Sequence, residues 1–246
     1  MIKWNSDVNT PHLFAQKGAA AALILATFAT LLSLNTTRAQ DFGDLLRPET
    51  PLVLREQGSF YVGGRNAQLS GLRGEPGMFD LPYAGQIAVE QMYVRYMIPD
   101  GVLKTPIVLM HGGTLSGKSY ETTPDGRMGW DEYFVRHNHA TYVPDQVGRG
   151  RSGFDASIIN LVHNGDAPVE DLPNFVRLGL DTAWLSFRFG PAPGIPYDNV
   201  QFPVEAADEL AKQGVPDLWD YPVEHTVNAL AELSAKLGGA VLVGHS

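Results

Sequence analysis

The residues with the clearest chemical potential stand at Gly244-His245-Ser246, where an apolar run leads into a Gly-x-Ser triplet. Residues 239–243 read Gly-Ala-Val-Leu-Val, which is typical of a short buried strand. A strand that turns sharply into Gly-x-Ser can present the serine hydroxyl above a sheet, where it can act as a nucleophile in acyl transfer. The pattern therefore makes Ser246 the candidate catalytic nucleophile.

Gly-x-Ser triplets are common, so this one needs support from its surroundings. Two others occur at Gly117-Lys118-Ser119 and Gly150-Arg151-Ser152, but neither directly follows a run of strand-forming residues. The alternative for residues 244–246 is a strand that ends in an ordinary Gly-Ser turn.

A second candidate element is His111-Gly112-Gly113-Thr114, which follows the apolar run 105–110. Acyl transfer needs N–H donors for the oxyanion of the tetrahedral intermediate, and a glycine-rich turn exposes its backbone N–H groups. We expect Gly112 to form this oxyanion loop and Gly113 to supply a donor. The alternative is a tight turn between a strand and a loop.

The same loop also fits the phosphate-binding pattern G-x-x-x-x-G-K-[ST] over residues 112–119. Such a site requires a helix that begins at the Lys-Ser pair and points its N-terminus at the phosphate. Pro124, Gly126 and Gly129 follow within a few residues and disfavour a helix there. Nucleotide binding is therefore a weak alternative.

Asp145 ends the run 140–145 and precedes a loop with glycines at 148, 150 and 153. An aspartate in this place can hold a loop by accepting hydrogen bonds from backbone N–H groups. It could also be a catalytic carboxylate. The structural role is the favoured interpretation.

The remaining histidines show neither metal-ligand spacing nor an obvious catalytic partner. The chain contains no cysteine, so disulfides and cysteine metal sites are excluded. We predict no metal, no cofactor and no catalytic histidine among these residues. The histidines concerned are His137, His139, His163, His225 and His245.

Hydrophobic periodicity predicts the elements that carry these residues. Strands at 59–64 and 87–98 form an opening antiparallel hairpin, and continuous apolar runs at 105–110 and 140–145 indicate strands of a parallel sheet. Helices are predicted at 129–137, 169–188, 203–214 and 224–237. Strands that alternate with helices favour an α/β fold with both faces of the sheet covered.

Residues 154–222 separate the fourth and fifth predicted strands and are rich in aromatic side chains, with prolines and glycines at 190–196. We interpret this segment as a helical lid inserted over a pocket. The alternative is a crossover with a long surface loop.

Composition narrows the classes of partner. The net charge of −9 and the absence of a basic stripe exclude a nucleic-acid role.

Lys3 and Lys17 precede an apolar run at 18–34, and Thr37-Arg38-Ala39 follows it, as in a secretory signal peptide at 1–39. We expect cleavage, export to a bacterial periplasm or medium, and no stable membrane association afterwards. An uncleaved anchor is the alternative.

Taken together, residues 50–246 resemble the α/β-hydrolase superfamily, and within it a small group of secreted bacterial serine carboxylesterases. The order of strand, His-Gly-Gly, helix, strand, Asp-x-x-Gly-Arg-Gly-Arg-Ser-Gly, inserted helices, strand and Gly-His-Ser carries the general likeness. The more specific likeness rests on Gln57–Arg65, Met92–Tyr96, Glu121–Phe134, Phe187–Pro191 and Gln201–Val204.

The resemblance implies an eight-stranded, mostly parallel sheet with a lid, and a Ser–acid–His triad in that chain order. It implies that Ser246 is the nucleophile, that Gly113 is an oxyanion donor and that a glutamate after the next strand is the acid. By this comparison the sequence holds about five of the eight strands and stops at the nucleophile. The loop has Gly113-Thr114 where a related esterase has cysteines.

We therefore expect the N-terminal portion of a secreted serine esterase, which hydrolyses small-molecule carboxylic esters through an acyl-enzyme on Ser246. Without the acid, the histidine and the second oxyanion donor, the 246 residues alone should be inactive. Their last strand should be an apolar exposed edge. The open alternatives are a non-catalytic pseudoenzyme or binding fragment, and the nucleotide binder; the oligomeric state and the ester preference are not predicted.

Overall fold

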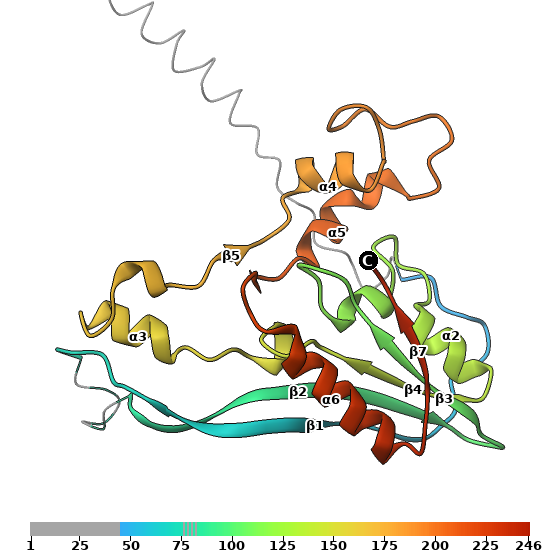
Figure 1. Ribbon diagram of the computed structural model, residues 1–246. Helices are drawn as coiled ribbons and strands as arrows, with labels where there is room; N and C mark the ends of the chain where they lie inside the picture. The colour runs from blue at the N-terminus through green and yellow to red at the C-terminus, as the bar shows by residue number, and fades with distance from the viewer. Residues whose placement is uncertain (1–44, 76, 78, 80, 82) are drawn as a thin grey trace, which may run out of the picture. The chain divides into compact units, whose positions relative to one another are not determined.

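A five-stranded sheet with the order β1-β2-β4-β3-β7 organises the chain (Figure 1). The computed structural model describes residues 45–246 except 76, 78, 80 and 82, so the predicted signal peptide at 1–39 lies outside the described residues. The strands of the main sheet are β1 (Leu54–Leu69), β2 (Gly85–Pro99), β3 (Lys104–Met110), β4 (His139–Pro144) and β7 (Val241–Gly244).

The sheet is mixed, as the sequence predicts. β1 and β2 form a long antiparallel hairpin, and β2 also pairs antiparallel with β4. β3 lies between β4 and β7 and runs parallel to both. β7 is an edge of this sheet, and Val241 and Leu242 on it are about half exposed.

The alternation of side chains along β3 builds the core on both faces of the sheet. Ile107 and Leu109 pack on one side, and Val108 and Met110 pack on the other. Successive side chains of a strand point to opposite faces, so a strand covered on both sides is apolar throughout. This is the physical reason for the unbroken apolar run that precedes His111.

Two helices cover the two faces. α6 (Val223–Lys236) places Ala229 and Leu233 in the cluster that contains Val108 and Met110, and it lies across β1 and β2 in Figure 1. α2 (Trp130–Arg136) contributes Phe134 to the opposite cluster, with Ile107 and Leu109. Both helices agree with the ranges predicted from the sequence.

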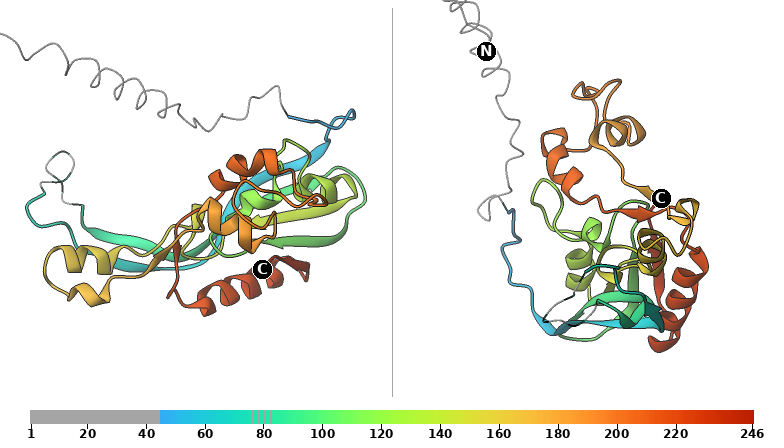
Figure 2. Two further views of the ribbon diagram at one scale, coloured as in Figure 1. Left: turned by 90° about the horizontal axis from the view of Figure 1, so that it is seen from above. Right: turned by 90° about the vertical axis from the view of Figure 1, so that its left-hand side faces the viewer.

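Residues 154–222 fold into several short helices and strands. Trp184, Phe189 and Ala207 form a separate apolar cluster within the segment. Figure 2 shows α3 beside the far end of the β1–β2 hairpin, apart from α4 and α5. The elements are α3 (Ser157–His163), η4 (Val169–Asp171), β5 (Phe175–Val176), α4 (Leu180–Ser186), η5 (Val204–Ala206), α5 (Ala207–Lys212) and β6 (Asp217–Leu218).

The predicted helix at 169–188 is wrong for most of its length. A single 3-10 turn occupies 169–171, β5 pairs antiparallel with β6, and helix begins only at Leu180. Leu172 is extended because it precedes Pro173, whose ring excludes the helical conformation from the residue before it. The predicted helix at 203–214 is confirmed by η5 and α5.

Candidate active site

Ser246 lies at the carboxyl end of β7, beside the loop that follows β3. The two strands run parallel with Met110 opposite Gly244, and the N–H of His245 donates to the carbonyl of Met110 at 3.0 Å. The carboxyl ends of adjacent parallel strands meet at one edge of the sheet, so the residues after β3 and β7 become neighbours. The topology thus brings together Ser246 and Gly112, which the sequence analysis selected independently.

The backbone of Ser246 adopts a conformation that side-chain-bearing residues rarely accept. Its φ is +93°, in the left-handed half of the Ramachandran map. A strained backbone at the residue after a strand is one feature of the geometry that exposes a nucleophilic serine hydroxyl at the top of a sheet.

Gly112 packs directly against this turn. A β-carbon on Gly112 would lie 2.7 Å from the Cβ of Ser246 and 2.8 Å from Nδ1 of His245. These separations are far below van der Waals contact, so this position requires glycine.

His111 is buried and fixes the start of the loop. Its Nε2 accepts the N–H of Gln146 at 3.0 Å, so its Nδ1 carries the proton and donates to the carbonyl of Gly112 at 2.9 Å. Burial lowers the pKa of His111 to about 4. With both ring nitrogens engaged, His111 is a neutral structural group.

The N–H of Gly113 is free to bind a ligand. It donates to no acceptor within the part of the chain that the structure describes, whereas the next N–H, of Thr114, donates to Asp217 Oδ2 at 3.0 Å. A free N–H between fixed neighbours is what an oxyanion donor requires. Thr114 itself is buried and has φ of +56°.

Sequence reasoning missed Arg149 and Asp217 at this loop. Arg149 donates to the carbonyl of Gly112 at 3.1 Å and forms an ion pair with Asp217. Arg149 belongs to the glycine-rich loop after β4, but Asp217 is remote in sequence and carries no local signal for this contact.

Asp145 organises the loop after β4, as the favoured interpretation holds. It is fully buried and accepts hydrogen bonds from the N–H groups of Gly117 and Arg151, both at 2.7 Å, and from the Arg151 guanidinium. Burial alone would raise the pKa of Asp145, but the bonds from Arg151 and from the backbone outweigh it and hold that pKa below its usual value.

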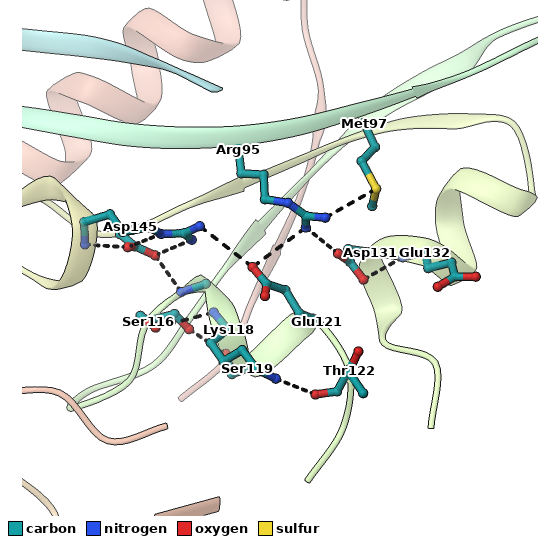
Figure 3. A network of polar contacts seen from close by, with 12 residues as sticks. Arg95, Met97, Ser116, Lys118, Ser119, Glu121, Thr122, Asp131, Glu132 and Asp145 are labelled. Carbon is teal, nitrogen blue, oxygen red and sulfur yellow. Dashed lines mark hydrogen bonds and ion pairs between the residues drawn. The ribbon is translucent and has the colours of Figure 1, made fainter. Parts of the chain in front are cut away.

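Figure 3 shows this carboxylate as one end of a polar network that reaches α2. Glu121 lies between two cations, with its Oε1 3.7 Å from Arg95 and 3.8 Å from Arg151. Arg95 continues to Asp131 at 2.7 Å. The network joins the loop after β3 to both β2 and α2.

The phosphate-binding alternative at 112–119 lacks its structural requirement. A 3-10 helix of four residues, η2 (Gly117–Tyr120), replaces the long helix. The N–H of Gly117 is taken by Asp145, and Lys118 Nζ donates to the carbonyl of Thr122 at 2.6 Å. Neither group is available to a phosphate.

A cavity of about 590 Å³ opens in front of Ser246. Aromatic side chains from the loop after β3, from α2 and from residues 154–222 form part of its walls. Its aromatic lining consists of Tyr120, Trp130, Phe187, Phe189 and Phe202.

The other histidines serve the scaffold or stand apart from the serine. His137 Nδ1 contacts the carbonyl of Tyr133, and His139 Nδ1 contacts that of Thr105. Across the described residues, no histidine ring is hydrogen-bonded to Ser246. The same residues hold no cluster of three or more metal-ligating side chains.

Comparison with known proteins identifies the fold. The solved structure of a bacterial esterase superposes on the chain with a TM-score of 0.76 and 48% sequence identity, over 81% of this chain and 62% of the esterase chain. The chain has an α/β-hydrolase fold. Its resemblance to a bacterial esterase, expected from the sequence, is confirmed.

A second comparison comes from a curated protein. The probable secreted lipase phiG of a fungal species is 35% identical over 82 residues, which are 33% of this chain and 22% of the lipase. The chain therefore spans less than two thirds of either relative. No family model matches it. Over the described residues, no helix has the length and apolarity needed to cross a membrane.

Proposed function

We propose that this chain carries the nucleophile of a secreted serine esterase. Ser246 Oγ attacks the carbonyl carbon of a carboxylic ester, the alcohol leaves with a proton, and water then cleaves the acyl-enzyme to release the acid. The observation that carries the proposal is the left-handed Ser246, which lines an apolar cavity and packs against Gly112, the residue before the free N–H of Gly113. The names of the esterase and lipase relatives support ester hydrolysis.

Gly113 and Gly112 have separate roles in this mechanism. The N–H of Gly113 stabilises the oxyanion as negative charge moves from the carbonyl carbon to its oxygen. Gly112 contacts no substrate; its missing side chain allows the loop to approach Ser246.

Residues 154–222 act as a lid in this proposal. Phe187, Phe189 and Phe202 from this segment line the cavity together with Ser246. Phe189 and Phe202 stack with their ring centroids 4.2 Å apart, which gives the segment an ordered apolar face toward the substrate. Such a face binds the apolar part of an ester and excludes water from the reacting carbonyl.

Ser246 has no general base in contact with it among the described residues. A serine hydroxyl is a weak nucleophile until a base accepts its proton. We therefore propose that the 246 residues do not turn over ester by themselves, and that the base and its acid partner are supplied by residues outside the described set.

Labelling with a fluorophosphonate probe tests the proposal. We compare the longest product of the gene with the 246-residue chain and map the modified peptide by mass spectrometry. The longest product should be labelled at Ser246 and should hydrolyse p-nitrophenyl esters, and its Ser246→Ala variant should do neither. The 246-residue chain should remain unlabelled.

Two outcomes would overturn it. Ser119 is the other serine of a Gly-x-Ser triplet that lines the cavity. If the probe labels Ser119, then Ser119 and not Ser246 is the nucleophile. If the Ser246→Ala variant still hydrolyses esters, Ser246 is not the nucleophile. Ser234→Ala on α6 serves as the control for serine substitution away from the cavity.

Export is the remaining part of the proposal. It rests on the basic and apolar pattern of residues 1–39 and on the secreted lipase relative. Mass spectrometry of protein from the culture medium or periplasm should find a mature N-terminus at Gln40. An intact Met1 on exported protein would contradict cleavage.

A further inference from the structure

An ion pair between Arg149 and Asp217 lies directly behind the Gly112–Thr114 loop. The side chains are only 12% and 7% exposed. Arg149 comes from the loop after β4, and Asp217 comes from β6 in the 154–222 segment. The pair therefore connects the segment proposed as a lid with the loop proposed to bind the oxyanion.

The pair holds this loop from both ends. Arg149 donates to the carbonyl of Gly112 at 3.1 Å, and Asp217 Oδ2 accepts the N–H of Thr114 at 3.0 Å. Between these two fixed groups stands the N–H of Gly113, which has no acceptor among the described residues. The carbonyl of Gly112 and the N–H of Gly113 belong to one planar peptide group, and the N–H of Thr114 belongs to the next, so these two contacts determine where the Gly113 N–H points.

Thr114 adopts a strained backbone that these contacts maintain. Its φ of +56° is a genuine outlier for a β-branched residue. Its N–H is bound by Asp217, and its carbonyl accepts the N–H of Val215 at 2.9 Å. Two residues of the same short stretch therefore clamp the peptide groups on both sides of Thr114.

Stability alone is a poor explanation for the pair. A buried ion pair contributes little net stability because desolvation of both charges offsets their attraction. Here the Nε of Arg149 is also buried without an acceptor among the described residues, which adds a cost. What the pair does provide is a defined orientation of the loop.

We propose that Arg149 and Asp217 are positioning residues that aim the N–H of Gly113 at the oxyanion and couple the 154–222 segment to the oxyanion loop. This inference rests on the proposed function. Neither side chain lines the cavity in front of Ser246; together with Gly113 they line a second cavity of about 270 Å³, so their described contacts are with the loop and not with the cavity at Ser246.

Steady-state kinetics on the ester-hydrolysing product of the gene test this role. Asp217→Asn keeps the shape of the side chain, but its amide must turn an N–H₂ toward one of two donors. Arg149→Lys keeps the charge but loses the planar fork that reaches Gly112 and Asp217 together. Each should lower kcat about 10- to 100-fold, with KM changed by less than about twofold.

A matched control separates orientation from general damage. Glu90→Gln on β2 removes the ion pair with Arg65 on β1 and alters the contact with His225 on α6, and it touches neither the loop nor the cavity. It should leave kcat unchanged at a temperature where all variants are folded, as circular dichroism verifies.

A rescue experiment tests the mechanism itself. Glycine adopts positive φ without steric cost. Adding Thr114→Gly to Asp217→Asn should therefore raise kcat about tenfold above that of Asp217→Asn alone. A merely structural role predicts no rescue, because the added glycine creates no new contact. If Asp217→Asn does not fold, the same comparison is made with Arg149→Lys and its Thr114→Gly double variant.

The outcomes distinguish this inference from the function on which it depends. If Ser246→Ala abolishes hydrolysis while Asp217→Asn and Arg149→Lys keep normal kcat, the positioning role is wrong and the esterase proposal stands. If the variants raise KM at constant kcat, the pair serves substrate binding and the inference is also overturned. If Ser246→Ala keeps activity, the proposed function itself fails.

Discussion

Gly112 and Ser246 approach so closely that no side chain fits between them: a β-carbon on Gly112 would stand 2.7 Å from the Cβ of Ser246. Gly112→Ala must therefore displace the loop, the turn at Ser246, or both. We expect kcat for ester hydrolysis, and the rate of fluorophosphonate labelling at Ser246, to fall about 100-fold, as for other misplacements near 1 Å.

Gly179→Ala is the matched control for this substitution. An added β-carbon there meets no atom within 4 Å, and its φ of −73° suits any residue. A Gly112→Ala protein that labels at the normal rate would show that the close packing has no part in catalysis.

The buried imidazole of His111 should make the fold sensitive to mild acid. Its pKa is lowered to about 4 in the folded protein, against about 6.5 in the unfolded chain. Between these values the unfolded chain binds more protons, so stability falls as pH drops from 6.5 to 4 and levels off below. The full difference is about 3 kcal/mol.

Urea unfolding at pH 7 and at pH 4.5 measures this effect. The His111→Gln variant is the comparison, because glutamine at position 111 does not titrate while every other titrating group is kept. We expect the variant to be less stable at pH 7 but to lose less stability on acidification than the parent. Equal losses in both proteins would assign the acid sensitivity to other groups.

Asp145 should prove structural rather than catalytic. Its carboxylate accepts bonds from Gly117 and Arg151, so Asp145→Asn should cost about 3–5 kcal/mol of unfolding free energy. The lowered pKa of Asp145 means that its contribution is complete above its unfolded pKa near 4 and is lost as pH falls through the folded value.

Kinetics of the remaining folded protein complete this test. When the rate is normalised to sites that react with the fluorophosphonate probe, Asp145→Asn should keep a kcat close to the parent value. A large loss of kcat per labelled site would instead favour a catalytic carboxylate.

Trp130 should contribute to ester binding without being needed for folding. It lines the cavity but is 56% exposed, and its ring lies 6.0 Å from that of Tyr120. An apolar acyl or alcohol group in the cavity would cover it, so Trp130→Ala should raise KM about tenfold for bulky apolar esters. Esters of acetate should be affected less.

The comparison of p-nitrophenyl butyrate or benzoate with p-nitrophenyl acetate checks this expectation. Trp219→Ala is a suitable control, because Trp219 is also exposed and does not line the cavity in front of Ser246. An equal KM change for large and small esters would show that Trp130 does not contact the variable part of the substrate.

Several features were readable from local pattern because local physics decides them. The unbroken apolar run before His111 indicates a strand covered on both faces, and β3 is such a strand. The glycines at 112 and 113 indicate a loop with exposed N–H groups. Asp145 before a glycine-rich loop indicates a turn organiser, and its hydrogen bonds agree.

Where periodicity was weak, the prediction failed. The prediction of a helix at 169–188 did not take account of Pro173. This proline keeps Leu172 extended, so the turn at 169–171 cannot continue as a helix. The two-stranded pairing of β5 with β6 was also missed, because its strands are two residues each and lie about 40 positions apart. Such pairs form only when the surrounding chain brings them together.

Residue types and short-range order along the chain were enough to select Ser246, Gly112 and Gly113 and to indicate an α/β fold, because strand periodicity and glycine-rich turns are local properties. Tertiary structure alone decided that Ser246 and Gly112 touch, since that contact depends on β7 pairing with β3 across 134 positions of sequence. It also decided that Asp217 reaches Thr114, because a hydrogen bond between remote residues leaves no periodicity to read.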